Sequence, residues 1–159
     1  MRSLARGDAV NHVIFLKRSL LFSWAVWLSV VFLSNVADAG KEAGLIGQSW
    51  AFASGNWKAI KETTARYGTP DLVNAVLFLG VILWEAAAAF LFWWAFWTFR
   101  GQKSGRRILY RAFTASLLLW AAFFVADELL IAYSFEATHL RLFIAQLVTL
   151  LAIELLPEE

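Results

Sequence analysis

The sequence predicts an all-α integral membrane protein, a bundle of four transmembrane helices with a short amphipathic external helix. Two observations lead to this fold class. Of the 159 residues, 60% are hydrophobic and 16% are charged, whereas soluble globular domains carry about a quarter charged residues. The apolar residues also gather into stretches of about 20, the length that crosses roughly 30 Å of hydrocarbon. We therefore expect a single polytopic membrane domain over residues 1–159.

Four apolar stretches predict the membrane spans, at about residues 20–36, 72–99, 108–133 and 140–156. The second stretch is long, roughly 42 Å as a helix, so it must tilt or project from the bilayer. Before the first span, residues 8–17 form a shorter apolar stretch that we expect to lie along the cytoplasmic interface. The triplet Ala37-Asp38-Ala39 is typical of a signal-peptide cleavage site, but we expect the first span to be an uncleaved anchor.

The external segment, residues 38–71, contains the predicted amphipathic helix. In SGNWKAIKETTARYGTP, Ser54 or Asn56 is suited to begin a helix as its N-cap, and Gly68 is suited to end it. One side of this helix carries Trp57, Ile60, Thr64 and Tyr67, and the other side is charged. We expect the helix to lie on the outer membrane surface. The alternatives are a cap on the bundle or a surface that faces a partner.

Basic residues predict the orientation in the membrane. Lys and Arg precede the first span, and the connection between spans two and three has five of them and no acid: Arg100, Lys103, Arg106, Arg107 and Arg111. Because short loops rich in Lys and Arg stay in the cytoplasm, we expect both termini there, in a bacterial inner membrane. We expect Glu154, Glu158 and Glu159 to lie on the same side, near the basic connection.

Several classes of chemistry are excluded or disfavoured by composition. The chain has no cysteine, which excludes disulfides, thiolate metal sites, iron–sulfur clusters and cysteine nucleophiles. The formal charge of +2 does not point to nucleic acid. Only His12 and His139 occur, neither of them deep in a span, so haem held by two histidines across the bundle is not expected. We predict no metal site and no cofactor, with bound lipid or quinone as the alternative.

Glu85 attracts attention because it lies midway along the second span, in VILWEAAAAF. An ionised carboxylate at that depth is costly unless it is paired or faces water. Polar residues at a similar depth on the other spans are Ser29, Ser116, Gln146 and Thr149. With only neutral partners, we expect a neutral Glu85 that hydrogen-bonds to another helix, and the four alanines after it allow close approach. The alternative is a role in proton transfer or in contact with an ion or quinone.

Charged residues also flank the predicted turn between spans three and four, near Phe135. Asp127 and Glu128 precede this turn, and His139 and Arg141 follow it. In an antiparallel pair these positions have similar depth, so we expect Asp127 or Glu128 to pair with Arg141, with His139 nearby. A salt bridge that holds the hairpin is the first interpretation. A metal or haem site is the alternative, although no His-x-x-x-His or Glu-x-x-His pattern supports it.

The end of the second span, FLFWWAFWTFR, is rich in aromatic residues that include Trp93, Trp94 and Trp97. The simplest interpretation is an aromatic belt at the level of the lipid headgroups. The alternative is a surface for a pigment, a quinone or a lipid tail, or an interface with another subunit.

Three short motifs resemble a known family. SNVADAG closes the first span, WEAAAA lies inside the second and IELLPEE follows the last. With four spans in a small chain, they resemble the bacterial family of predicted small integral membrane proteins of unknown function. In that family the first span ends with an Asn and a nearby Asp, matched here by Asn35 and Asp38. The resemblance implies the fold and implies no activity.

Two functions remain from the sequence. The favoured one is a small accessory or structural subunit, packed against a larger membrane complex and surrounded by lipid, without catalysis of its own. The alternative is binding or transfer of a proton, a quinone or a small hydrophobic ligand, centred on Glu85. A membrane enzyme has less support, because no paired acid and nucleophile, metal triad or phosphate loop is evident.

Overall fold

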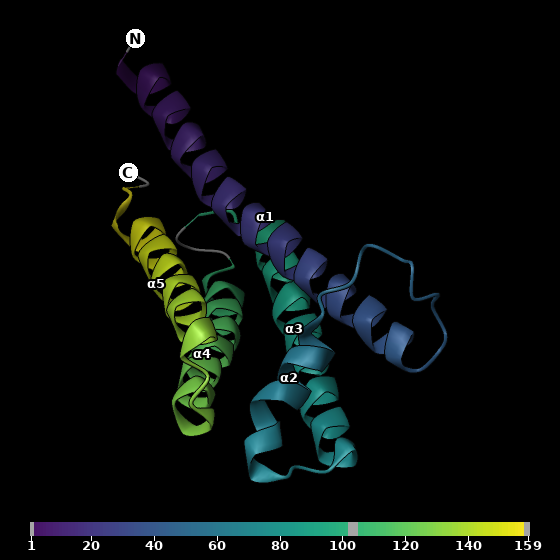
Figure 1. Cartoon of the computed structure of the whole chain (residues 1–159). Coiled ribbons are helices and arrows are strands. Elements are labelled where there is room, and N and C mark those ends of the chain that lie inside the picture. The colour runs from purple at the N-terminus through teal and green to yellow at the C-terminus, as the bar shows by residue number, and fades with distance from the viewer. Residues whose placement is uncertain (1, 102–104, 158–159) are drawn as a thin grey trace.

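The structure is a computed structural model that describes residues 2–101 and 105–157, and these residues form helices and loops without a strand. The elements in chain order are α1 (Arg2–Glu42), α2 (Asn56–Thr64), the 3₁₀ helix η1 (Ala65–Tyr67), α3 (Asp71–Thr98), α4 (Arg106–Leu130) and α5 (Tyr133–Leu155). Of these, α1, α3, α4 and α5 are long and apolar enough to cross a membrane (Figure 1). The predicted fold class is confirmed. Lys103, Glu158 and Glu159 lie outside the described residues.

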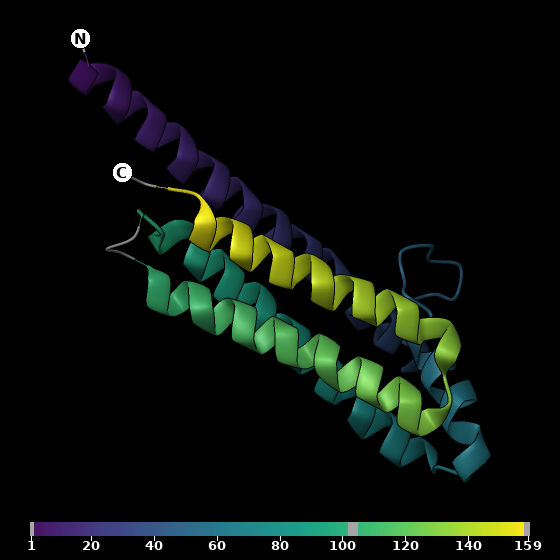
Figure 2. The same ribbon diagram turned by 90° about the vertical axis from the view of Figure 1, so that its left-hand side faces the viewer.

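The four spanning helices pack in chain order, α1 against α3, α3 against α4 and α4 against α5. Figure 2 shows both termini at one end of the bundle and α2 at the other; we call these the terminal end and the α2 end. On α3, the buried residues Glu85, Ala88, Ala89 and Phe92 share one face. Two of the four alanines after Glu85 therefore allow the close helix contact that was expected.

α1 is longer than the sequence analysis expected. A single helix of 41 residues, roughly 62 Å long, includes both the predicted span at 20–36 and the stretch at 8–17. The expected separate interfacial stretch is therefore wrong, because no proline breaks the helix and isolated polar residues do not interrupt its hydrogen bonds. Lys17 marks the terminal end of the bundle, where its Nζ donates to the Leu156 carbonyl at 2.8 Å. The first turns of α1 project beyond this point (Figures 1 and 2).

The turn between α4 and α5 also differs from the expectation. It consists of Ile131, with a φ of 56°, and Ala132, whereas the turn expected near Phe135 falls inside α5. The polar residues at the start of α5 lower the local hydropathy without interrupting the helix. Hydropathy therefore located the apolar part of α5 and missed its first two turns.

The connection between α1 and α3 packs onto the bundle. α2 contacts both α1 and α3, and the ring of Trp57 lies 6.0 Å from that of Phe78 on α3. Thr64 is buried, and its hydroxyl donates to Asn74 Oδ1 at 2.9 Å. Gly68, with a φ of 62°, ends η1 as predicted. α2 is thus a cap on the α2 end of α1 and α3, the first of the two alternatives to a helix lying on the membrane surface.

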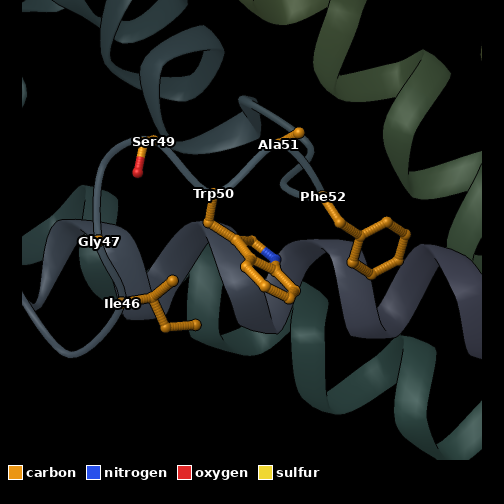
Figure 3. A pocket seen from close by; sticks show the side chains of 6 residues that line it. All are labelled: Ile46, Gly47, Ser49, Trp50, Ala51 and Phe52. Carbon is orange, nitrogen blue, oxygen red and sulfur yellow. The ribbon is translucent and has the colours of Figure 1, made fainter.

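The loop before α2 encloses an open hollow of about 520 Å³, lined by Ile46, Gly47, Ser49, Trp50, Ala51 and Phe52 (Figure 3). The rings of Trp50 and Phe52 both project from this loop. No charged residue occurs between Glu42 and Lys58. The hollow therefore offers apolar surface and few groups that could do chemistry.

Candidate functional site

Glu85 is the centre of a buried hydrogen-bonded cluster that joins three helices. Its side chain is 2% exposed, and that of Asn35 on α1 is fully buried. The Asn35 amide nitrogen donates to Glu85 Oε1 at 2.9 Å and to Oε2 at 2.7 Å. Asn56, the first residue of α2, donates from its own amide to Asn35 Oδ1 at 2.8 Å. A polar chain therefore runs from exposed Asn56 through Asn35 to the middle of α3.

A second carboxylate belongs to Asp38 on α1. It lies one turn from Asn35 and holds the start of α2. Asp38 Oδ2 accepts from the backbone N–H of Trp57 at 2.8 Å and from the Ser54 hydroxyl at 3.1 Å. Ser54 Oγ in turn accepts the N–H of Asn56 at 3.2 Å. Two of the free N–H groups at the helix start thus find acceptors, although the residue before the helix is Gly55. The predicted N-cap, Ser54 or Asn56, is therefore wrong: Gly55 occupies that position, and the acceptors come from Ser54, one residue earlier, and from a carboxylate of another helix.

The partner of Glu85 differs from those considered in the sequence analysis. In the described residues none of the four candidates is hydrogen-bonded to Glu85: Ser29, Ser116, Gln146 and Thr149. Ser29 accepts from Trp93 Nε1 at 3.0 Å, and Thr149 accepts from Trp24 Nε1 at 3.1 Å. The reason is that α1 continues to Glu42, so Asn35 lies about two turns inside the helix instead of at its end. Its depth then matches that of Glu85.

Asn35 and Asp38 carried a signal that could have found this site. Both are polar residues near the end of an apolar stretch, one helical turn apart and so on one face. Like Glu85, they are polar side chains at membrane depth, which need partners. From the sequence Asn56 is suited only to an N-cap, because its contact with Asn35 depends on how α2 folds back.

The hairpin of α4 and α5 is held by Asp127 and His139 instead of by Arg141. His139 Nδ1 lies 2.6 Å from Asp127 Oδ2, and the imidazole stacks on the ring of Phe123 at 4.7 Å. Arg141 and Glu128 are exposed, and among the described residues neither Asp127 nor Glu128 forms an ion pair with Arg141. The turn begins earlier than expected, so the residue opposite Asp127 shifts from 141 to 139.

The three tryptophans at the end of α3 divide between two surfaces. Trp93 turns toward α1, where its indole nitrogen donates to Ser29 and its ring lies 5.7 Å from that of Phe22. Trp94 and Trp97 remain exposed, as an aromatic belt requires. At the same end, Arg106 pairs with Glu154, which places this acid beside the basic connection as expected.

The described residues contain no group of three or more His, Asp or Glu side chains placed to hold a metal ion. What the Glu85 cluster can do chemically is limited to hydrogen bonding and to proton exchange at one carboxyl group. The Asn35 amide binds and orients this carboxyl group, and the Asn56 amide in turn holds Asn35.

Comparison with known proteins yields one match. The model of a family described as "Predicted small integral membrane protein (DUF2165)" matches residues 13–155. No curated protein and no solved structure matches the chain. The matched region contains the four spanning helices apart from the first turns of α1.

Proposed function

Because the chain belongs to this family of predicted small integral membrane proteins, we propose that it is a small accessory subunit that packs against a larger membrane protein, without catalysis of its own. The observation that carries this proposal is the projecting part of α1. Residues 2–16 precede Lys17, where α1 is bonded to the end of α5, and they extend roughly 22 Å further. Isolated helices of this length are marginal in water, so a partner surface would stabilise them.

Exposed apolar side chains on the projecting part support a protein partner. Phe15 is 72% exposed and Leu16 is 47% exposed, directly beyond the point at which the other helices end. The proposed orientation places this end on the cytoplasmic side of a bacterial inner membrane, together with the basic connection between α3 and α4. The partner would then contact the subunit at the cytoplasmic face of the membrane.

Site-specific photo-crosslinking in cells tests the accessory role. A benzophenone amino acid at Phe15 is expected to give an adduct of defined mass with one membrane protein. The matched control is Leu83, which is 61% exposed in the middle of α3 and is expected to reach only lipid. If both positions give lipid adducts only, and the protein purified at its native level is monomeric, the proposal is wrong.

The orientation has an independent test, because the chain lacks cysteine. Single cysteines at exposed Gln48 and Asn11 report on the α2 end and on the terminal end, respectively. A membrane-impermeant maleimide is expected to label Gln48→Cys in intact cells and Asn11→Cys only after permeabilisation. The opposite pattern contradicts cytoplasmic termini.

A second candidate function is proton or ligand binding at Glu85, and the polar chain from exposed Asn56 to Glu85 favours it. Under this proposal a proton or a small ligand reaches the carboxyl group from the α2 end. Glu85→Gln keeps the hydrogen-bonding shape and removes the exchangeable acid proton, whereas Glu85→Leu removes both. An infrared band of the carboxyl group, lost in Glu85→Gln, should change when a short-chain quinone is added or the pH is changed. A band that stays constant excludes this candidate.

A further inference from the structure

A set of buried polar side chains separate from the Glu85 cluster lies where α4 and α5 pack together. It comprises Gln146 on α5 and Trp120 and Ser116 on α4. Gln146 and Ser116 are fully buried, and Trp120 is 2% exposed. The only buried residues of α5 are Gln146 and Ile153. One of the two buried side chains of α5 is therefore an uncharged amide.

The contact between Asp127 and His139 fixes the register of this set. Trp120 lies about two turns from Asp127 along α4, and Gln146 lies about two turns from His139 along α5. The two helices are antiparallel, so both steps lead in the same direction. Because seven residues are about two whole turns, Trp120 lies on the same face of α4 as Asp127, and Gln146 lies on the same face of α5 as His139. The backbone positions of Trp120 and Gln146 therefore lie at one depth, with Ser116 one turn beyond Trp120, and the Trp120 ring also stacks on that of His139 at 6.3 Å.

α1 encloses the same place from the other side. Trp24 Nε1 donates to Thr149 Oγ1 at 3.1 Å, which sets the level of α1 against α5. Because the two helices are antiparallel, moving three residues forward on α1 and three residues back on α5 brings Trp27 level with Gln146. The ring of Trp27 lies 5.6 Å from that of Trp120. Aromatic rings from α1 and α4 thus meet at the depth of Gln146.

The hydrogen-bonding groups of this set have no partner in the part of the chain that the structure describes. They are Gln146 Oε1 and Nε2, Trp120 Nε1 and Ser116 Oγ. Buried polar groups are normally hydrogen-bonded, and the requirement is stricter inside a membrane, where water is scarce. The indole and the amide nitrogen are donors, and the amide oxygen is an acceptor. A hydroxyl group can accept from the two donors and also donate to the acceptor, whereas a carbonyl group only accepts.

We propose that Gln146, Trp120 and Ser116 form an intramembrane binding site for a hydroxyl-bearing molecule. Two sources share this chemistry. Water fits the enclosed position, because buried waters typically bond about three polar groups. A lipid-soluble quinol is the other source: with its hydroxyl group in this site, its ring would lie against Trp27 and Trp120. Its entry requires α5, which has few buried residues, to move aside. The site is independent of the proposed partner surface at the projecting end of α1.

The test uses the full chain in lipid nanodiscs with ¹⁵N-labelled tryptophan. The Trp120 indole signal is identified by its loss in Trp120→Phe. With water in the site, the Trp120 indole proton shows a cross-peak to water, and this cross-peak is lost in Gln146→Leu. Trp24, whose indole donates to Thr149, is the internal control. Its signal is expected to stay unchanged in Gln146→Leu, which also shows that this variant is folded.

The second arm adds a short-chain benzoquinol. A quinol site predicts cross-peaks from the Trp120 indole proton to the ring protons of the quinol, with loss of these cross-peaks in Gln146→Leu. Either arm supports the proposal and identifies the source of the hydroxyl group. If Trp120 contacts neither water nor the quinol, or if its indole proton bonds directly to the Gln146 amide, the proposal is overturned.

Discussion

Replacing Asn35 with alanine should destabilise the bundle more than any other single removal of a polar side chain on α1. The Asn35 amide makes three contacts, two with the Glu85 oxygens at 2.9 and 2.7 Å and one with Asn56 at 2.8 Å. Asn35→Ala removes all three and leaves the Glu85 carboxyl group buried without its partner on α1. The perturbation therefore acts on two helix contacts, α1 with α3 and α1 with α2.

The expected loss follows from the energetics of buried hydrogen bonds. Hydrogen bonds between membrane helices contribute on average about 0.6 kcal/mol and up to about 1.7 kcal/mol. A buried polar group left unpaired adds about 1–3 kcal/mol. Together these give a loss of about 2–5 kcal/mol in the free energy of unfolding for Asn35→Ala. Glu85→Gln should cost less, because an amide in the same place still accepts from Asn35.

Unfolding by sodium dodecyl sulfate in mixed micelles, followed by the fluorescence of the nine tryptophans, measures this loss. The matched control is Asn11→Ala, at an exposed asparagine on the same helix, with an expected change within about 0.5 kcal/mol. A double-mutant cycle with Glu85→Leu should show a coupling energy of about 1–2 kcal/mol. Additive effects of the two substitutions would refute the argument, as would an Asn35→Ala variant as stable as its control.

Three further predictions concern other contacts. His139→Leu leaves the buried Asp127 without its partner, so the free energy of unfolding should fall by about 1–3 kcal/mol in the same assay. Asp38→Ala removes the acceptor of the Trp57 N–H, so hydrogen exchange of the α2 amides should become faster, consistent with a cap worth about 1 kcal/mol. Gly105→Ala would bring a Cβ within 2.7 Å of Phe99 Cα, at a φ of 83°, and should lower the yield of folded protein and its midpoint of unfolding.

Each of these predictions has a matched control in the chain. Arg141→Ala, at an exposed position near His139, should leave the stability of the hairpin unchanged. Glu42→Ala removes an exposed acid of α1 and should not alter exchange in α2. Gly80→Ala adds a Cβ that meets no atom within 4 Å beyond the adjoining residues and backbone of its own helix, and it should raise helix stability by up to about 1 kcal/mol. Controls as damaging as the test substitutions would show that the contacts named here do not determine stability.

The sequence predicted the elements of this fold well because the bilayer imposes a strong constraint on composition. A stretch such as Asp71–Thr98 needs about 20 apolar residues to cross the membrane, so hydropathy finds it within a residue at each end. The external helix was predicted from its spacing and from Gly68, which adopts the positive φ expected at a helix end. The ends of α1 and the start of α5 were less well predicted. In these places the helix continues through polar residues, and hydropathy detects only its apolar part.

The contacts of the candidate site were harder to predict than its central residue. Depth was counted from the ends of each predicted span, which assumes that the helices align at their ends. α1 continues to Glu42, past the predicted end of its span at 36, and Asn35 therefore lies inside the helix at the level of Glu85. The hairpin differs for a similar reason, because the turn lies earlier than expected and the partner of Asp127 is His139 instead of Arg141. Register depends on turn length and helix offset, and neither follows from hydropathy.

Each packed pair of spanning helices contains at least one polar contact, and this pattern gives a structural reason for Glu85. Asn35 and Glu85 join α1 to α3, the Trp84 indole donates to the Ala115 carbonyl between α3 and α4 at 2.9 Å, and Asp127 meets His139 between α4 and α5. Lipid is as apolar as the helix surfaces, so the hydrophobic effect does not select which helices meet. Polar contacts and small residues make that selection. The carboxyl group of Glu85 is thereby explained by assembly, whether or not it also binds a proton or a ligand.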